Sequence, residues 1–368
     1  MSTIRAALLT EGSATFEVAD LELQPPQQGE LGVRIAATGF CHSDLSIRRG
    51  TIPHLFPAVL GHEAAGIVEE VGSGVEGFAP GDHVVLAWLP QCGECFYCRH
   101  SQPQLCATSE GTLVGMQQDG SLRRTTPDGT PVFAMCGIGS FAQHAVVPAS
   151  SAARVPDDLA LDRVALIGCA VLTGVGAVLN SARVEAGSTV LVVGVGGVGL
   201  NIVQGARIAG AERIIAADVS GEKLELARKL GATHTARSPD ESPVALSRDL
   251  TDGRGADYTF EAIGRPDTAR QAFDATRAGG TTVLIGLAGV DAVLELPLLR
   301  MVAREHRLTG SWYGSADIQR DVPRAIELFR TGQLDLDALV TGTGGLEDIE
   351  AAAQALESGQ AVRTVITP

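Results

Sequence analysis

One stretch, residues 189–218, constrains the fold more than any other part of the chain. It reads TVLVVGVGGVGLNIVQGARIAGAERIIAAD, which is a β-branched run, a glycine-rich turn, an apolar-periodic segment and a second apolar run ending at Asp218. This order predicts a strand, a tight turn, a helix and a second, parallel strand. Because further segments alternate in the same way towards the C-terminus, we expect an α/β protein with a doubly wound parallel sheet.

The glycines of this turn have separate roles. Gly194 permits the tight turn, Gly196 lets backbone amides approach a pyrophosphate, and Gly199 lets the helix pack closely on the strand. The helix N-terminus also favours negative charge. Asp218, 19 residues after Gly199, is placed to accept hydrogen bonds from the adenosine ribose and to repel a 2′-phosphate. The stretch therefore predicts a dinucleotide site that prefers NAD to NADP. The alternative is an ordinary βαβ turn without a ligand.

Length and charge limit the other classes of function. The 368 residues are enough for two domains, and 45% of them are hydrophobic, so each domain can bury a core. The net charge of -15 argues against a nucleic-acid partner or an anionic membrane. No apolar run reaches the length of a membrane span. The first residues, MSTIRAALLTEGS, contain no signal-peptide pattern, so we expect a cytoplasmic protein that acts on a small molecule.

Four of the seven cysteines lie close together in the sequence. They are Cys92, Cys95, Cys98 and Cys106, with the spacing Cys-x2-Cys-x2-Cys-x7-Cys. Four thiolates at this spacing can enclose one Zn²⁺ tetrahedrally and leave no open position, so we predict a structural zinc lobe over residues 92–106. The alternatives are four incidental thiols or a zinc finger that grips nucleic acid. The acidic balance and the lack of a basic recognition helix disfavour the latter.

A second metal set is suggested by residues that lie far apart. Cys41 and His62 stand beside glycines at the ends of predicted strands, and Cys169 precedes the nucleotide-binding stretch. Two thiolates and one imidazole would leave the fourth position of a tetrahedral zinc open, which is typical of a catalytic site. Asp44 and Glu63 are close enough in sequence to support these ligands. The alternative for each cysteine is a small core residue.

These motifs together carry a family resemblance. GFCHSD (39–44), GHEAAG (61–66), the four-cysteine lobe, GCAVLTGVGA (168–177) and GVGGVG (194–199) resemble the medium-chain zinc-dependent alcohol dehydrogenases. The resemblance extends over essentially the whole chain, to VRTVIT at 362–367. It implies a GroES-like, partly closed β-barrel catalytic domain over 1–171, a Rossmann NAD-binding domain over 172–312, and a return to the catalytic domain over 313–368. It also implies a homodimer, because the long segment 107–136 is similar to the loop of the dimeric members.

The resemblance also implies roles for individual residues. The catalytic zinc is expected on Cys41, His62 and Cys169, and the structural zinc on the lobe, giving two zinc ions per chain. Ser43 is expected in the proton relay, Asp44 beside His62, and Glu63 behind the metal. Expected cofactor contacts are His42, Thr173, Gly194, Gly196, Gly197, Val198, Gly199, Asp218, Lys223 and Arg363. Expected walls of the substrate pocket are Ile52, Trp88 and Cys136.

Three departures from the family pattern affect these expectations. Ser46 stands where many relatives have a histidine at the outer end of the proton relay, so the last proton step must use water, Ser46 or another base. His42 replaces a common arginine, and it could instead be a plain polar residue at a strand end. Ile52 replaces an acidic residue of the glutathione-dependent formaldehyde dehydrogenases. Cys136 is as consistent with a core thiol as with a pocket wall.

The expected reaction is reversible oxidation of a primary or secondary alcohol to an aldehyde or ketone, with hydride transfer to NAD. Two alternatives remain. One is an S-(hydroxymethyl)glutathione (formaldehyde) dehydrogenase, which the residue at Ile52 disfavours. The other is a catalytically silent relative that binds NAD and zinc, which the intact ligand set and Ser43 disfavour. The sequence does not name the alcohol.

Overall fold

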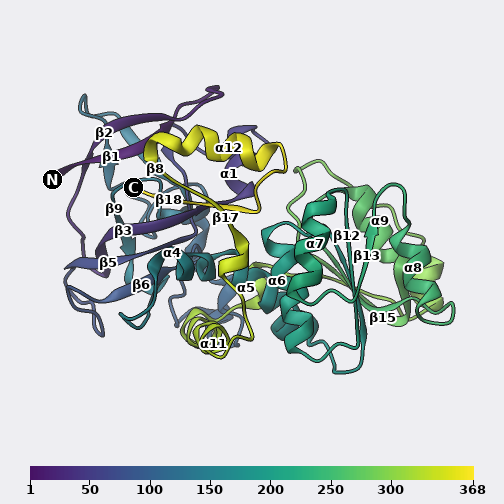
Figure 1. Ribbon diagram of the computed structural model, residues 1–368. Coiled ribbons are helices and arrows are strands. Elements are labelled where there is room, and N and C mark those ends of the chain that lie inside the picture. Colours follow the sequence, from purple (N-terminus) through teal and green to yellow (C-terminus); the bar gives the residue numbers. More distant parts are fainter. The chain divides into compact units, whose positions relative to one another are not determined.

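The computed structural model describes all 368 residues and divides into two compact units. The first unit contains residues Met1–Cys169, Asp317–Phe329 and Leu339–Pro368, and the second contains Ala170–Ala316 and Arg330–Ala338. The expected return segment, 313–368, is thus shared, with residues 313–316 and 330–338 belonging to the second unit. Figure 1 shows both units with their elements labelled.

Two sheets form the body of the first unit. Five strands close into a barrel in the order β1-β2-β7-β8-β4, which confirms the expected barrel-containing domain. These strands are β1 (Ser2–Leu9), β2 (Glu17–Leu23), β7 (Arg124–Thr125), β8 (Pro131–Ala134) and β4 (Ala58–Val59). The second sheet has the order β10-β6-β5-β3-β18-β17, with β9 also paired to β3. Its strands are β3 (Glu30–Phe40), β5 (Ala64–Val71), β6 (His83–Leu86), β9 (His144–Pro148), β10 (Ala152–Arg154), β17 (Val340–Gly345) and β18 (Arg363–Thr367).

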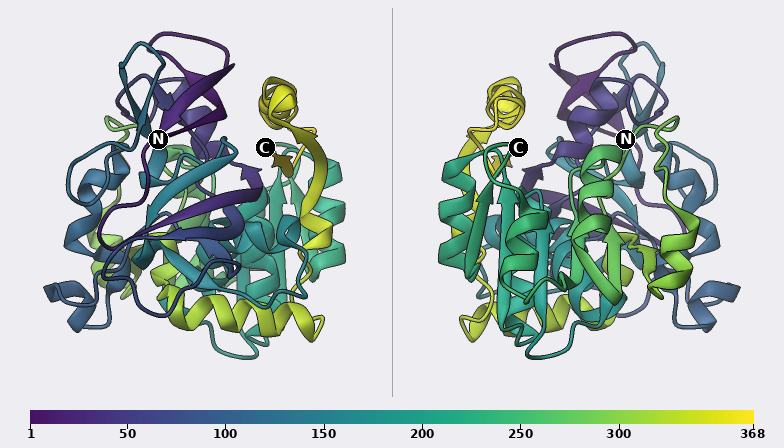
Figure 2. Two further views of the ribbon diagram at one scale, coloured as in Figure 1. Left: turned by 90° about the vertical axis from the view of Figure 1, so that its left-hand side faces the viewer. Right: turned by 90° about the vertical axis from the view of Figure 1, so that its right-hand side faces the viewer.

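The helices of the first unit are mostly short. They are α1 (His42–Arg48), α2 (Phe96–Arg99), α3 (Glu110–Leu113), α4 (Leu161–Val164), α11 (Ile318–Arg330) and α12 (Ile349–Glu357), with a 3₁₀ turn η3 at Met135–Gly137. Figure 2 shows α11 from the side and α12 end-on, so the two C-terminal helices run in different directions. Strand β17 lies between these helices in the chain and β18 follows α12; β18 pairs with β3 through Thr364 and Phe40. This pairing brings the C-terminal strand to the residues that precede Cys41.

The second unit is the predicted parallel sheet with helices on both faces. Its six strands run in the order β13-β12-β11-β14-β15-β16, and every pair is parallel. They are β11 (Thr189–Val193), β12 (Arg213–Asp218), β13 (His234–Arg237), β14 (Ala256–Glu261), β15 (Thr276–Leu284) and β16 (Arg307–Gly310). The helices are α5 (Ala170–Gly176), α6 (Gly197–Ile208), α7 (Gly221–Leu230), α8 (Pro243–Asp249), α9 (Pro266–Ala275) and α10 (Leu298–Ala303). Figure 1 shows α6 and α7 on one face and α8 and α9 on the other.

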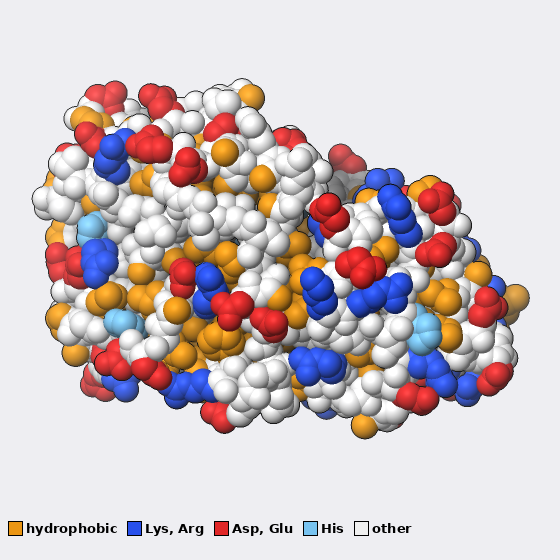
Figure 3. Space-filling model, viewed as in Figure 1, with side chains coloured by type: hydrophobic (Ala, Val, Ile, Leu, Met, Phe, Trp, Pro, Cys, Tyr) orange, Lys and Arg blue, Asp and Glu red, His pale blue; other side chains and the backbone are white.

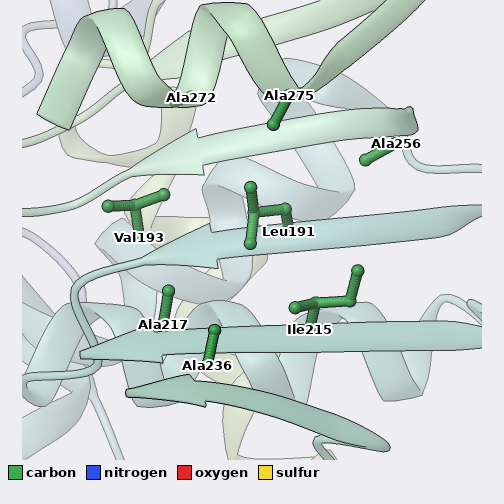
Figure 4. Packing of buried hydrophobic residues seen from close by; sticks show 8 residues of the cluster. All are labelled: Leu191, Val193, Ile215, Ala217, Ala236, Ala256, Ala272 and Ala275. Carbon is green, nitrogen blue, oxygen red and sulfur yellow. The ribbon is translucent and has the colours of Figure 1, made fainter. Parts of the chain in front are cut away.

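The core of this sheet is built from small and β-branched side chains. Leu191 and Val193 of β11 lie beside Ile215 of β12, and Ala272 and Ala275 of α9 cover them (Figure 4). All five of these residues are buried. Alanines on the helix let it approach the sheet closely, and all five residues of strand β11 are buried, as expected of a parallel strand that is covered on both faces.

None of the helices combines the length and the apolar composition that a membrane span needs. The apolar helices Leu161–Gly168 and Ala170–Ala182 reach that length only when taken together, and the chain bends by 52° between them. Acidic and basic side chains are intermingled on the face of the molecule that Figure 3 shows.

Candidate functional site

The structure brings six cysteines and one histidine into two groups that could each hold a metal ion. The first is Cys92, Cys95, Cys98 and Cys106, and the second is Cys41, His62 and Cys169. Within each group all ligand atoms lie within 4.8 Å of one another. These are the two groups that the sequence predicted.

The four-cysteine lobe is preformed by its own backbone. The amide of Cys95 donates to Cys92 Sγ at 3.3 Å, and that of Cys98 donates to Cys95 Sγ at 3.5 Å. The amide of Cys92 donates to Cys106 Sγ at 3.4 Å. The amide of Cys98 is the main reason why the pKa of Cys95 falls to about 6. Amides directed at sulfur favour thiolates, and four thiolates fit a closed tetrahedral zinc.

The Cys41, His62 and Cys169 group is assembled by three separate segments and is buried. Cys41 directly follows β3 and is the N-cap of α1, whereas His62 lies between β4 and β5. Cys169 follows a 3₁₀ turn at Ala165–Gly168, and its Sγ lies 3.3 Å from His62 Nε2. Three such ligands leave a fourth tetrahedral position for another group, which fits a catalytic zinc.

Asp44 connects two of these ligands. One carboxylate oxygen accepts a hydrogen bond from the Cys41 amide at 2.8 Å. The other accepts from the Gly61 amide at 3.0 Å and lies 3.4 Å from His62 Nδ1. Asp44 is fully buried, so its charge is compensated only by these groups and the nearby metal-ligand set. A single side chain thus fixes the backbone at Cys41 and orients the imidazole of His62.

Glu63 and Arg363 form a buried pair behind the same group. Arg363 Nε lies 3.3 Å from both carboxylate oxygens of Glu63, and its Nη2 lies 3.6 Å from Cys41 Sγ. The resemblance had assigned Arg363 to the cofactor pyrophosphate, and that role stays a prediction. The contact with the sulfur was not foreseen, because it depends on the pairing of β18 with β3.

The pKa values in this group reflect burial and close charges. Burial raises the pKa of Glu63 to about 7, although Arg363 favours its charged form. The pKa of Cys41 lies well below its ordinary value, because the Cys169 thiol hydrogen-bonds to its sulfur and Arg363 adds positive charge. Burial opposes the protonation of His62, but Asp44 and Cys41 outweigh it and raise the pKa of His62. The group therefore favours a thiolate at Cys41, the form that binds metal.

The remaining predicted residues of the first unit have different positions. Ser43 Oγ lies 3.9 Å from Cys41 Sγ, and His42 is exposed on the first turn of α1. Ser46 donates its hydroxyl hydrogen to the His42 carbonyl at 3.1 Å. Trp88 and Cys136 are buried, whereas Ile52 is partly exposed.

The glycine turn of the second unit has the expected geometry. Gly194 has a φ of 88°, in the left-handed region. A Cβ at Gly199 would lie 1.9 Å from the Gly194 carbonyl oxygen, whereas a Cβ at Gly196 would meet nothing within 4 Å. Gly196 therefore opens space before α6, whose first turn begins with Gly197 and Val198. This space and these amides fit a pyrophosphate.

Asp218 and its neighbours complete this part of the second unit. Asp218 ends β12, and its carboxylate accepts hydrogen bonds from the amides of Val195 and Ser220, both at 2.9 Å. Lys223 lies in the first turn of α7. Thr173 on α5 is buried, and its hydroxyl has no hydrogen-bond partner in the protein.

One set of ion pairs within the first unit was not predicted from the sequence. Arg48, at the end of α1, pairs with Glu350 at 3.0 Å and with Glu357 at 3.2 Å, both on α12. Its guanidinium also lies over the Phe16 ring, 5.8 Å from the centroid. The helix that carries Ser43 is thereby attached to the helix that precedes Arg363. Nothing in the sequence pairs these charges, which are about 300 residues apart.

Comparisons with known proteins agree with this geometry. Residues 27–157 match the alcohol dehydrogenase GroES-like domain, and residues 197–331 match the zinc-binding dehydrogenase family. The chain is 39% identical to an NDMA-dependent alcohol dehydrogenase from Amycolatopsis methanolica, over 98% of both chains. It is 36% identical to an S-(hydroxymethyl)glutathione dehydrogenase from Paracoccus denitrificans, over 98% of this chain and 99% of that protein.

A solved structure is similar over the whole length. The benzyl alcohol dehydrogenase from Acinetobacter calcoaceticus has a TM-score of 0.94 at 30% identity, covering 100% of this chain and 99% of that one. The family models, the relatives and the fold thus indicate the same family. The chain belongs to the medium-chain, zinc-dependent alcohol dehydrogenase family.

Proposed function

We propose that this protein oxidises a primary or secondary alcohol reversibly to an aldehyde or ketone, with zinc and NAD. The observation that carries the proposal is the buried group of Cys41, His62 and Cys169, which offers three ligands and leaves one position for a substrate. When bound, zinc supplies a positive charge that acidifies an alcohol hydroxyl, and NAD supplies the hydride acceptor.

The side chains around this group have roles in holding and protonation. Asp44 fixes the Cys41 backbone and His62, so the ligand set is preorganised for the metal. Arg363 places a positive charge against Cys41 Sγ, which reduces the electron donation of that thiolate. Ser43, whose hydroxyl lies 3.9 Å from the same sulfur, is the group we assign to accept the substrate proton. Its onward path uses water, Ser46 or another base.

The second unit holds the cofactor in this proposal. The open space at Gly196 and the first amides of α6 support a pyrophosphate, and Asp218 supports the adenosine ribose. Each oxygen of Asp218 already accepts one backbone amide and has a lone pair left for a ribose hydroxyl. A 2′-phosphate beside this carboxylate would be repelled, which is why we propose NAD rather than NADP.

A second candidate within the same chemistry is S-(hydroxymethyl)glutathione. The 36% identical relative from Paracoccus denitrificans carries that name. The fold and the metal groups are equally suited to both substrates, so only the substrate preference separates them.

The deciding experiment is the appearance of NADH absorbance at 340 nm. Zinc-loaded protein and NAD are mixed with short, long, branched and aromatic alcohols, and with S-hydroxymethylglutathione. We expect NADH with at least one simple alcohol, abolished by a chelator and restored by zinc. Activity on the glutathione adduct far above every alcohol would favour the second candidate. Bound NAD and full zinc without turnover on any substrate would make the protein a silent binder.

The cofactor preference is tested at Asp218. Asp218→Asn keeps one of the two acceptors for the backbone amides of Val195 and Ser220 but removes the negative charge, so the ratio of kcat/KM with NADP to that with NAD should rise about tenfold. Glu222→Gln, an exposed charge on the next helix, is the control and should leave the ratio unchanged. An unchanged ratio in Asp218→Asn would remove Asp218 from the discrimination.

We also propose that the partner in solution is a second copy of this chain. Six large apolar side chains between residues 287 and 302 are 46% to 81% exposed, and α10 in this segment has no buried residue. The adjacent strand β16 is an edge of its sheet, since it pairs only with β15. An apolar segment beside an open strand edge is costly to leave in water. Leu298→Asp should convert a dimer to a monomer in light scattering, whereas Leu55→Asp should not.

The compartment belongs to the proposal as well. Six of the seven cysteines are arranged as metal ligands, and all seven are free thiols. Thiol ligands persist where thiols are kept reduced, so we propose the cytoplasm. Fractionation of cells that express the chain under its native signals would test this.

A further inference from the structure

Cys136 is the one cysteine outside both metal groups. It is 7% exposed, and its backbone has a φ of 57°, in the left-handed region that residues with a side chain rarely adopt. Burial raises the pKa of its thiol to about 11, and the charges of His62, Asp44 and Cys41 also act on it. The thiol is thus neutral, and it belongs to neither metal group.

The segment that carries Cys136 is bonded directly to the segment that carries His62. The amide of Ser140 donates to the Gly61 carbonyl, and that of Phe141 donates to the Leu60 carbonyl, both at 3.0 Å. The contact is tight, because a Cβ at Gly61 would lie 2.6 Å from Ser140 Oγ. The position of Cys136 relative to the metal ligand is therefore determined by the backbone between residues 136 and 140.

That backbone is irregular. Besides Cys136, Gly137 has a φ of 69° and Gly139 a φ of 56°. Three left-handed residues within four positions form no regular hydrogen-bond ladder, so their carbonyls need other donors. A left-handed residue with a side chain persists only where its surroundings determine it.

Two buried side chains from the preceding segment supply these donors. Gln117 Nε2 donates to the carbonyls of Gly137 at 3.2 Å and Val146 at 3.1 Å. Arg124 Nη2 donates to three carbonyls at 3.1 Å, those of Ile138, Gly139 and His144. Both side chains are almost fully buried. Every carbonyl from residue 137 to residue 139 thus accepts a hydrogen bond from a side chain of the 107–136 segment.

We propose that Gln117 and Arg124 are positioning residues that hold the Cys136 thiol at the catalytic metal group and so determine which alcohols fit by size. The selectivity part of this proposal rests on the proposed function. Without these donors, the backbone at 136–139 relaxes towards ordinary conformations and the thiol moves away from the metal group. The space beside the metal then admits bulkier alcohols.

The experiment uses two variants and one matched control in the zinc-loaded protein. Gln117→Met keeps the length of the side chain but removes its donors, and Arg124→Lys removes the forked guanidinium. Gln118→Met is the control, because Gln118 is exposed and donates only to Thr108 Oγ1. Folding of each variant is checked by thermal melting, and Arg124→Lys decides if Gln117→Met does not fold.

The first readout is independent of activity. With zinc on both metal groups, Cys136 is the one thiol without a metal, so its alkylation by iodoacetamide is followed by mass spectrometry. Loss of a buried hydrogen bond should speed this reaction about fivefold in Gln117→Met and leave Gln118→Met unchanged. Unchanged alkylation in both variants would overturn the positioning role, whether or not the protein oxidises alcohols.

The second readout is the ratio of kcat/KM for benzyl alcohol to that for ethanol. It should rise about fivefold in the variants relative to the control. Faster alkylation with an unchanged ratio would overturn the selectivity part. No turnover in the wild type would contradict the proposed function, and the alkylation rates would still decide the positioning role.

Discussion

The two metal groups of this protein are built in opposite ways. The lobe takes all four ligands from residues 92–106, and its backbone amides point at three of the four sulfurs. The group of Cys41, His62 and Cys169 takes each ligand from a different segment and is buried. The His62 imidazole is contacted by the side chain of Asp44, and the Cys41 sulfur by that of Arg363.

The difference separates local from global construction. A local group closes one short loop, so its metal contributes to folding stability and offers no position for a substrate. A group assembled from distant segments exists only once the first unit has folded. The fold itself then holds the three segments together, and the metal can keep one position for a substrate. We therefore expect metal loss to affect stability in one group and turnover in the other.

The largest expected effect is on turnover. Cys41→Ser should reduce zinc content by one ion per chain and turnover by at least about a thousandfold, because the metal charge at the reacting oxygen is lost. Metal analysis and the 340 nm assay measure both. Cys136→Ser, a buried cysteine outside both groups, should keep both ions. Substantial turnover in Cys41→Ser would contradict the claim that this group supports turnover while the lobe supports stability.

The next effect is on stability. Cys95→Ser should also lose one zinc ion, but it should lower the melting temperature by roughly 5–10 °C and leave turnover at 25 °C within about twofold. Calorimetry and the same assay measure these changes. A loss of turnover as large as that in Cys41→Ser would show that the lobe supports the catalytic group and that the comparison is wrong.

The smallest effect provides a baseline for acid titrations, in which both metal groups also lose zinc. His306 of the second unit is buried, stacks on Phe273 with ring centroids 4.0 Å apart, and lies 2.9 Å from Thr282 Oγ1. Burial and two nearby arginines lower the pKa of His306 to about 4. The neutral ring therefore contributes stability above pH 6.5, and this is lost as the pH falls from about 6.5 towards 4.

The measurement is denaturant unfolding at pH 7 and pH 5. The wild type should lose roughly 2 kcal/mol more than His306→Gln over this interval, because the unfolded chain takes up the proton first. The difference between the two proteins removes the contribution of the metal groups. An identical pH dependence of the unfolding free energy in both proteins would mean that the pKa of His306 is not lowered in the folded state.

Short-range patterns in the sequence predicted much of the structure. The strand, glycine turn and helix at 189–208 follow from β-branched residues and glycines within one unit, and their geometry depends on neighbours in sequence. The lobe spacing belongs to the same kind of information. Strands β13, β16 and β17 were not anticipated, because four to six residues with mixed polarity carry too weak a pattern.

Other features depended on contacts between distant segments. The Arg363 guanidinium reaches Cys41 Sγ because β18 pairs with β3, and Arg48 meets Glu350 because α12 lies beside α1. Gln117 and Arg124 look like ordinary polar loop residues in the sequence, and only burial against irregular carbonyls reveals their role. The sequence by itself determined the nucleotide-binding unit and the lobe, since these arise from local spacing. The ligands Cys41, His62 and Cys169 lie far apart in the sequence, and the resemblance to a known family indicated them. Only the tertiary structure decided how the ligands are oriented and held. Folding buries side chains that are distant in sequence next to one another, and their hydrogen bonds and charges then act on the ligands.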